Sequence, residues 1–522
     1  MNKPADILLI NSLSPRQRSL SDTCLENSLC ILRTYLEEKG FNVVVFDRQR
    51  THLLEKGVPR FIFKILRILV KQQIKFMNSG KKTPAMLSML AAWPFHSAGI
   101  KLRKLYLDKL IKEIVSYVKE NKIRLVGIKT WYGDSYKWSV RLSESLKAEC
   151  PECIVFCGGP HVKVHGERIL NFGSFDLAIS GAGELVLEEL IRLIRKHPHK
   201  NNFIRIVTKM NGGSKLLTEN FIDNRRVDII PHYREEDLEN KIHMHTIVDG
   251  IGCTWNKCAF CSHPKVGYTL RDVDLIIKEM KLMINNGISL FRFSSSDTSI
   301  DHGRRISDAI LKNKLNIRYS FFSRCSGFSP ERYESYKLMI ESGLKAVFLG
   351  GETGNDKINR IVMNKGVCRK DIIDTINLIK DASKETGKKC YIGLAMIYPC
   401  PLPQNIGVTM EEIFNDNISL IEATMPDTVI ITPPSPLPDT NWLKNSSYYG
   451  FEFGDDYLNK LMNYEYVMYK PPELWPELDI SLNSHKLSEF LAETGRLRKK
   501  VNSMGIPTDI VDEYFLMADS IG

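Results

Sequence analysis

Short apolar runs alternate with helical segments in two successive arrays of the 522-residue chain, a pattern typical of parallel α/β folds. In the first array, residues 1–197, the predicted strands are ILLINS, NVVVFD, LVGIKTW, IVFCGG and LAISG. We therefore predict a doubly wound, Rossmann-like domain. In such a domain a ligand is normally held by the loops that follow the strands.

The second array, residues 242–440, has six predicted strands separated by helical segments. They lie at 243–249, 290–294, 317–322, 346–349, 391–397 and 428–432. We predict a partial (β/α)6 barrel, with its chemistry on the loops after the strands. Residues 198–241 are polar and weakly periodic, so we predict a linker there. Residues 441–522 are expected to form a mostly helical C-terminal region.

Residues 48–121 separate two strands of the first array by far more than a usual crossover, which predicts an inserted helical subdomain. Within residues 58–75 the run PRFIFKILRILVKQQIKF interleaves apolar residues with Arg and Lys. A helix at a lipid surface has this pattern. A helix packed on its own protein has it too, and packing is the favoured interpretation, with peripheral membrane contact as the alternative.

Composition constrains the partners and the localisation of the protein more than its chemistry. The chain has 72 Lys and Arg against 61 Asp and Glu, and the resulting net charge of +11 permits acidic partners without identifying one. The first ten residues lack the features of a secretory signal, and no apolar run approaches ~18 residues, so we expect a cytoplasmic protein. Twelve cysteines are too sparse for a disulfide scaffold, which favours reduced thiols and a metal site.

Three cysteines, Cys253, Cys258 and Cys261, lie close together in GIGCTWNKCAFCSHP, directly after the first predicted strand of the barrel. Thiolates suit zinc or an iron–sulfur cluster, and structural zinc would need a fourth ligand, for which His263 is the candidate. A [4Fe–4S] cluster held by three cysteines leaves one iron open to a cofactor or substrate. The position of the cysteines, where the catalytic loops of a barrel begin, favours the cluster.

These residues resemble the radical S-adenosylmethionine (SAM) enzymes, specifically the subfamily with an N-terminal cobalamin-binding domain, and the resemblance covers most of the chain. Phe260 matches the aromatic residue that precedes the last cysteine of the family motif. Three residues usually separate the first two cysteines, whereas four, 254–257, separate them here. The later stretch ETGNDKINRIVMNKG also resembles the family.

The resemblance implies that the open iron of a [4Fe–4S] cluster chelates the amino and carboxylate groups of SAM. It further implies that Ser295 and Asp297 line the SAM site, that Arg324 pairs with the SAM carboxylate, and that Glu352 binds its amino group or ribose. Two other interpretations stay open. Arg324 and Glu352 could form a structural ion pair between strands, and Ser295 and Asp297 could cap the next helix.

In the first array, IVFCGGPH and DLAISGAGELVLEEL resemble the cobalamin module of the same family. Gly158, Gly159, Gly181 and Gly183 allow close backbone approach to a large ligand, or tight strand-to-helix turns. The order and spacing of these glycine pairs favour a cobalamin site.

The Asp-x-His-x-x-Gly motif that supplies a histidine to cobalt in other cobalamin proteins is absent from the sequence. The resemblance therefore implies a cobalt without a histidine ligand, and His161 and His165 are interpreted as polar loop residues near the nucleotide tail. Glu184 either caps its helix or contacts the corrinoid side chains. Trp131 and Tyr132 either pack after the third strand or cover the lower face of the corrin.

In this family, cobalamin and SAM imply methyl transfer via methylcobalamin to an unactivated carbon or phosphorus, after a 5′-deoxyadenosyl radical removes a hydrogen. Cyclisation, ring contraction or rearrangement without net methylation is the alternative. A zinc-stapled nucleic-acid binder is an alternative of another class, but the sequence has no clustered basic-aromatic module, so nucleic acid is not expected. The expected partners are a small-molecule, lipid or peptide substrate and a reductant such as flavodoxin or ferredoxin.

Overall fold

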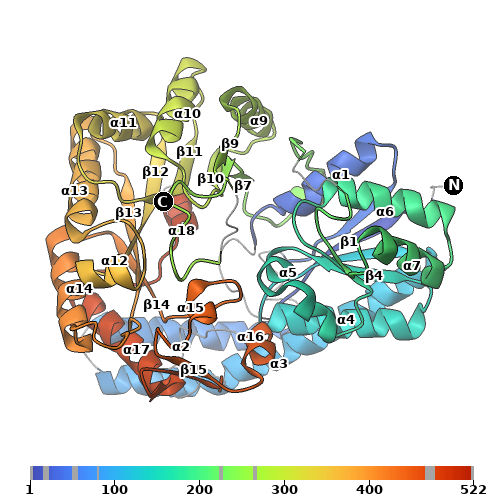
Figure 1. Ribbon diagram of the computed structural model, residues 1–522, viewed down its shortest axis with the longest axis horizontal. Coiled ribbons are helices and arrows are strands. Elements are labelled where there is room, and N and C mark those ends of the chain that lie inside the picture. The colour runs from blue at the N-terminus through green and yellow to red at the C-terminus, as the bar shows by residue number, and fades with distance from the viewer. Residues whose placement is uncertain are drawn as a thin grey trace. The chain divides into compact units, whose positions relative to one another are not determined.

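The computed structural model describes residues 4–15, 23–49, 57–78, 82–222, 227–262, 267–464 and 477–518. The chain folds into two compact units (Figure 1). The first comprises residues 1–242 with a short segment near Met462, and the second comprises the other residues from His243 onward. Among the described residues, no helix is long and apolar enough to cross a membrane.

The first unit is built on a sheet of six parallel strands in the order β2-β1-β3-β4-β5-β6. Both faces of the central strands are buried, as expected for a parallel sheet covered by helices on both sides. The strands are β1 (Ile7–Asn11), β2 (Val43–Phe46), β3 (Leu125–Lys129), β4 (Ile154–Gly158), β5 (Leu177–Ile179) and β6 (Leu216–Leu217).

Helices cover the two faces of this sheet with separate apolar cores, which confirms the doubly wound prediction. One core joins the sheet to α1 (Asn27–Glu38), α6 (Glu184–Lys196) and α7 (Lys200–Met210). The other joins it to α4 (Asp134–Glu149), to α5 (Pro160–His165) and to the second half of α3. The strand order reverses between β1 and β3, so a ligand is expected beyond the carboxyl ends of these strands.

The predicted helical insertion consists of α2 (Arg60–Asn78) and α3 (Lys82–Glu120), which pack on each other. The second half of α3 buries Leu107, Leu110 and Ile114 in the core of the first unit. The first half of α3 and most of α2 contribute few buried side chains.

The prediction of a linker at 198–241 was wrong for much of that stretch. It contains α7, strand β6, which pairs with β5, and the short helix α8 (Glu235–Leu238). Lys200 in α7 pairs with Asp176 at 2.8 Å and donates to the backbone oxygen of Cys153 at 2.6 Å. The weak periodicity has a simple cause, since β6 has two residues and α8 has four.

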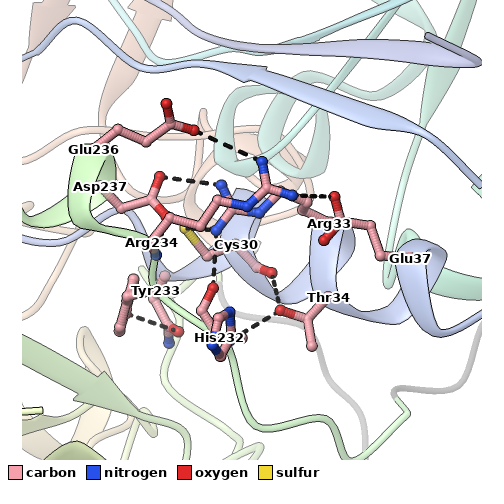
Figure 2. Close-up of polar contacts among 10 residues, drawn as sticks. Cys30, Arg33, Thr34, Glu37, His232, Tyr233, Arg234, Glu236 and Asp237 are labelled. Carbon is pink, nitrogen blue, oxygen red and sulfur yellow. Dashed lines mark hydrogen bonds and ion pairs between the residues drawn. The ribbon is translucent and has the colours of Figure 1, made fainter. Parts of the chain in front are cut away.

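A buried arginine holds the end of this stretch against α1 (Figure 2). Arg33 in α1 donates from both terminal nitrogens to the carboxylate of Asp237, at 2.5 and 3.1 Å, and to the backbone oxygen of His232 at 2.8 Å. Nearby, Arg234 pairs with Glu37. Residues 232–237 belong to the first unit. The contacts of Arg33 hold them there, since a buried arginine without a partner would be strongly destabilising.

The second unit contains six parallel strands in the order β14-β13-β12-β11-β10-β7, which confirms the partial barrel. They are β7 (Met244–Ile247), β10 (Leu290–Phe293), β11 (Arg318–Arg324), β12 (Leu344–Glu352), β13 (Tyr391–Ile397) and β14 (Thr428–Thr432). The helices between them are α9 (Val273–Asn285), α10 (Ile300–Lys312), α11 (Pro330–Glu341), α12 (Asp356–Ile361), α13 (Arg369–Thr386) and α14 (Met410–Thr424). A small hairpin, β8 (Gly250–Ile251) and β9 (Thr269–Leu270), flanks the cysteine loop.

The C-terminal region is helical but also contains a small antiparallel sheet, β15 (Phe451–Phe453), β16 (Ile480–Leu482) and β17 (His485–Lys486). Its helices are α15 (Asn441–Lys444), α16 (Tyr457–Met462), α17 (Leu487–Ser503) and α18 (Asp512–Ala518). Helix α18 packs on β10, β11 and β12, where Phe515 lies against Phe348 and Tyr391. The last helix therefore completes the core inside the partial barrel.

Candidate functional site

A cavity of about 210 Å³ in the second unit lies at the carboxyl ends of the barrel strands. All three cysteines of the motif line it, together with three of the residues predicted for SAM: Cys253, Cys258, Cys261, Phe260, Arg324 and Glu352. Strand β11 ends at Arg324 and β12 ends at Glu352, so the sheet itself brings these side chains to the cysteine loop. The cavity thus combines soft sulfur donors with two cationic side chains, Arg324 and Lys365, and one anionic side chain, Glu352.

Asp297 fixes the beginning of the cysteine loop. Its carboxylate accepts hydrogen bonds from the Thr254 hydroxyl at 2.5 Å and from the Arg324 backbone N–H at 3.2 Å, and the Cys253 sulfur lies 3.8 Å away. Asp297 is buried, and the cap of helix α10 is Ser299 instead. The interpretation of Asp297 as a helix cap is therefore wrong.

Ser295 does not line the cavity, and it contacts another carboxylate, that of Asp249. Its hydroxyl donates to Asp249 at 2.8 Å, and its backbone N–H donates to the same side chain at 3.1 Å. Asp249 also accepts from Thr298, and burial raises its pKa. Ser296, not Ser295, lines the cavity, and Ser295 does not cap α10.

Trp255, inside the lengthened spacer, anchors the middle of the cysteine loop. Its indole N–H donates to the backbone oxygen of Asn364 at 2.6 Å. The Trp255 ring packs against Gly366, which has a φ of +68°. A Cβ added to Gly366 would lie only 2.5 Å from the nearest atom of this ring. Further along the loop, the Ala259 N–H donates to Met363 at 2.9 Å. The longer spacer is thereby held against residues 363–366.

Arg324 and Glu352 do not pair with each other. The Arg324 guanidinium lies 5.2 Å from the centre of the Trp255 ring and donates to the backbone oxygen of Lys365 at 2.7 Å. Glu352 forms its ion pair with Lys365, at 2.7 Å between Oε1 and Nζ. The interpretation of an Arg324–Glu352 pair is therefore wrong, and Lys365 is a cavity residue that the sequence analysis did not single out.

The Glu352–Lys365 pair is buried, and the backbone makes space for it. Burial opposes the charge of Lys365, but the Glu352 carboxylate and the neighbouring Cys258 together outweigh burial, so the pKa of Lys365 is raised. A Cβ on Gly350 would lie 2.5 Å from the Lys365 nitrogen and 2.8 Å from the Glu352 carboxylate. Glu352 itself has a φ of +62°, an uncommon conformation for a non-glycine residue. The end of β12 is thus shaped around this pair.

The cysteine side chains suit an iron–sulfur cluster by the chemistry of their donors. Three thiols face one cavity, and the neighbouring carboxylate is already engaged by Lys365. Burial raises the pKa of the Cys258 thiol to about 11, so a positive ligand is needed to hold the thiolate. Among the described residues no three metal-binding side chains converge on a single ion, and His263 lies outside them.

In the first unit, buried polar atoms gather at the carboxyl edge of the sheet. Within the described ranges, those without a hydrogen-bond partner include Asn11 Oδ1, Ser12 Oγ, Ser135 Oγ, His161 Nε2 and His165 Nδ1. These residues follow or end β1, β3 and β4, the strands at and beside the reversal of strand order. A ligand rich in amide groups would satisfy such atoms, so the edge fits cobalamin.

The two histidines differ from the sequence interpretation, since they are not loop residues. His161 and His165 lie on α5, buried, with ring centres 4.5 Å apart. Burial lowers the pKa of His161 to about 3 and that of His165 to about 4. Both are therefore neutral near pH 7 and able to accept or donate a hydrogen bond.

The other residues predicted for cobalamin lie around the same edge. Gly158 ends β4, and Gly159 has a φ of +96°. Gly181, with a φ of +105°, and Gly183 lie between β5 and α6, and Glu184 is the first, buried residue of α6 while Gly183 occupies the cap position. Trp131 and the exposed Tyr132 follow β3 with their rings edge to face, 6.4 Å apart.

Family models match both units. The model of the radical SAM superfamily matches residues 247–398, and that of the B12 binding domain matches residues 82–191. No curated protein sequence matches the chain.

The solved structures of one enzyme, OxsB, share this fold. The cobalamin-dependent S-adenosylmethionine radical enzyme OxsB, with aqua-cobalamin and S-adenosylmethionine bound, is 14% identical and aligns over 97% of this chain with a TM-score of 0.54. OxsB with aqua-cobalamin alone gives the same values, and the chain spans 62% of the length of OxsB. Methylornithine synthase (PylB) aligns over 38% of this chain and 56% of its own, at 13% identity and a TM-score of 0.28.

The second unit is thus a radical SAM domain, a class that works with a [4Fe–4S] cluster and SAM. The first unit carries a B12-binding domain. The chain therefore combines a radical SAM domain with a B12-binding domain, and the cofactors of these two domains are the cluster, SAM and cobalamin.

Sequence reasoning missed Trp255, Lys365 and Asp249 as residues that shape the site. Trp255 had a usable signal, an aromatic side chain within a spacer that is one residue longer than usual. Lys365 lies in the asparagine–lysine–glycine sequence that was noted only as a resemblance. Asp249 lies two residues after the end of β7, where polar residues of a barrel are expected, and this position could have indicated its role.

Proposed function

We propose that this cobalamin-dependent radical SAM enzyme is a methyltransferase that modifies an unactivated carbon or phosphorus of its substrate. The observation that carries the proposal is one chain with a three-thiol cavity in a radical SAM domain and a B12-binding domain before it. When bound, the cofactors supply a hydrogen-abstracting radical and a methyl group. The protein must bind them, orient them and exclude water.

In this proposal Cys253, Cys258 and Cys261 hold the [4Fe–4S] cluster. The cavity beside them offers Arg324 for the carboxylate of SAM and Glu352 for its amino group or ribose. Both charged groups are held in place by Lys365, since Arg324 donates to its backbone oxygen and Glu352 pairs with its side chain. Such fixed polar groups orient a ligand without reorganising when it binds.

Four further residues complete the proposed SAM site. Phe260 lines the cavity and is the aromatic neighbour of the cluster. Asp297 and Ser295 act indirectly, through the cysteine loop and through Asp249 respectively. Trp255 positions Arg324 by lying under its guanidinium.

The proposed cobalamin site is the carboxyl edge of the sheet in the first unit. His161 and His165 offer unpartnered nitrogens to the amide groups and nucleotide tail. The backbone at Gly158, Gly159, Gly181 and Gly183 gives the tail close approach, and Glu184, Trp131 and Tyr132 contact the corrinoid. The remaining partners are a small-molecule, lipid or peptide substrate and a reductant of the flavodoxin or ferredoxin class.

The experiment uses anaerobically reconstituted protein with cobalamin, a strong chemical reductant and SAM that carries a trideuterated methyl group. The bound cobalamin is then extracted and analysed by mass spectrometry. Methyltransferase function predicts labelled methyl on the extracted cobalamin, a result that does not require the substrate. Cobalamin without label, in protein that still cleaves SAM reductively, would contradict methyl transfer and favour cyclisation or rearrangement.

A further inference from the structure

Helix α2 and the first half of α3 carry nearly all of the excess positive charge of the chain. Residues 57–107 contain ten Lys and Arg and no Asp or Glu, while the whole chain has a net charge of +11. The rest of the chain is therefore almost neutral. A segment with this composition is attracted to a surface of negative charge.

The same helices expose large apolar side chains to an unusual degree. On α2 the exposed fraction is 57% for Phe61 and 56% for Ile68. On α3 it is 54% for Met86, 58% for Leu87 and 56% for Leu90. Single exposed apolar residues are common, whereas a cluster on two adjoining helices marks a binding surface.

On α2 the basic and apolar side chains share one face. Phe61, Lys64, Ile68, Lys71 and Lys75 recur at steps of three and four residues, and all five are exposed. Apolar side chains flanked by lysines on one exposed face are the arrangement of a helix that lies in a bilayer interface.

On α3 the two kinds of side chain follow each other along the helix. Met86 and Leu90 precede Lys101 and Lys104, all of them exposed. Because α2 and α3 are consecutive and pack on each other, the two exposed faces belong to one structural element.

From these observations we infer that α2 and residues 82–105 of α3 form a docking surface for the face of an anionic lipid bilayer. Phe61, Ile68, Leu87 and Leu90 enter the boundary between headgroups and acyl chains, and the Lys and Arg side chains contact lipid phosphates. This inference goes beyond the proposed function, because it concerns where the enzyme works and not which bond it forms.

Two other occupants suit the surface less well. A nucleic acid would pair with the cations but leaves no role for the large apolar side chains of this surface that are more than half exposed. A second copy of the chain would bring two equally basic segments together, which is repulsive. A bilayer with anionic headgroups satisfies both the charge and the apolar side chains.

The test is co-sedimentation of the full-length protein with vesicles of phosphatidylglycerol and phosphatidylcholine in equal parts, and with phosphatidylcholine vesicles. We expect binding to the anionic vesicles only, weakened by salt. Lys64→Glu with Lys71→Glu should reduce binding by about tenfold or more. Phe61→Ser with Ile68→Ser should abolish the binding that persists at high salt.

Helix α9 supplies matched control variants in the second unit. Lys278→Glu with Lys281→Glu makes the same change of charge at exposed positions, and Leu275→Ser with Leu282→Ser repeats the seven-residue spacing of the apolar pair. Both controls should bind vesicles as the unsubstituted protein does. Circular dichroism of each variant checks that it is folded.

Three results would overturn the inference. One is absent or equal binding to the two kinds of vesicle. Another is loss of binding in the α9 controls to the same extent as in the α2 variants. The third is tight, salt-sensitive binding of duplex DNA by protein that does not bind vesicles. None of these results depends on SAM cleavage, so the inference fails or stands separately from the proposed function.

Discussion

The carboxylate of Asp297 accepts a hydrogen bond from the hydroxyl of Thr254 at 2.5 Å, one residue after the first cysteine of the motif. The same carboxylate accepts from the backbone N–H of Arg324 at 3.2 Å. One buried side chain thereby ties the cysteine loop to the end of β11. The loop is held in place by the barrel before any cofactor binds.

Asp297→Asn should loosen the cluster while leaving the fold intact. Both carboxylate oxygens accept hydrogen bonds, and an amide can replace only one of them. Loss of such a supporting contact typically lowers metal affinity about 10- to 100-fold. Iron release to a chelator from reconstituted protein measures the effect. Asp301→Asn, at an exposed position of α10, is the control, and equal release from the two variants would contradict this role.

Two substitutions of Trp255 should weaken SAM binding to different extents. Trp255→Ala removes both the ring under Arg324 and the N–H bonded to Asn364, whereas Trp255→Phe removes the N–H and keeps a smaller aromatic ring. SAM binding, measured by equilibrium dialysis, should weaken by at least about tenfold in the alanine variant, and by less in the phenylalanine variant, since one hydrogen bond contributes about 0.5–1.5 kcal/mol. Equal affinity in both variants and the unsubstituted protein would exclude a positioning role for Trp255.

Lys365→Met leaves the Glu352 carboxylate buried without its cation. Breaking a buried pair in this way costs about 3–5 kcal/mol in the free energy of unfolding. The exposed pair of Lys370 with Asp374 is the control, and Lys370→Met should change stability by no more than about 0.5 kcal/mol. Urea denaturation of both variants measures the difference. Similar stability of the two variants would show that the Glu352 pair is not a buried, energetically important contact.

The raised pKa of Glu513 predicts how the stability of the protein changes with pH. Burial, followed by the neighbouring Asp512 carboxylate, raises the pKa of Glu513 to about 7. The folded state then binds a proton that the unfolded state releases, so this group makes the protein less stable as pH rises from about 4.5 to 7. Glu513→Gln should gain stability relative to the unsubstituted protein over that window, by about 1–3 kcal/mol. A stability difference that is constant with pH would contradict the shifted pKa.

The strands of the barrel could be predicted well from the sequence because they are buried apolar runs. Strands β13 and β14 begin and end at the predicted residues. Residues 198–241 could not be predicted, since α7 is held by the pairing of Lys200 with Asp176 and α8 by Arg33 with Asp237, contacts that no local pattern reveals.

The residues of the candidate site could be predicted where they belong to a sequence motif. The contacts between side chains that are far apart in the sequence could not be predicted. The cysteines, Phe260, Arg324 and Glu352 all line one cavity. The partner of Glu352 proved to be Lys365, because Gly350 leaves space for its ammonium group beside the carboxylate. Ser295 follows a strand as expected, yet its side chain bonds to Asp249 and does not line the cavity.

Electron paramagnetic resonance of the anaerobically reconstituted, dithionite-reduced protein, recorded before and after addition of SAM, tests the central claim most directly. If Cys253, Cys258 and Cys261 hold a [4Fe–4S] cluster with one open iron, a reduced-cluster signal will appear and will shift when SAM is added. Replacing the three cysteines by alanine should remove the signal while the first unit still binds cobalamin. A signal that SAM leaves unchanged, or one that survives the triple substitution, would contradict the account.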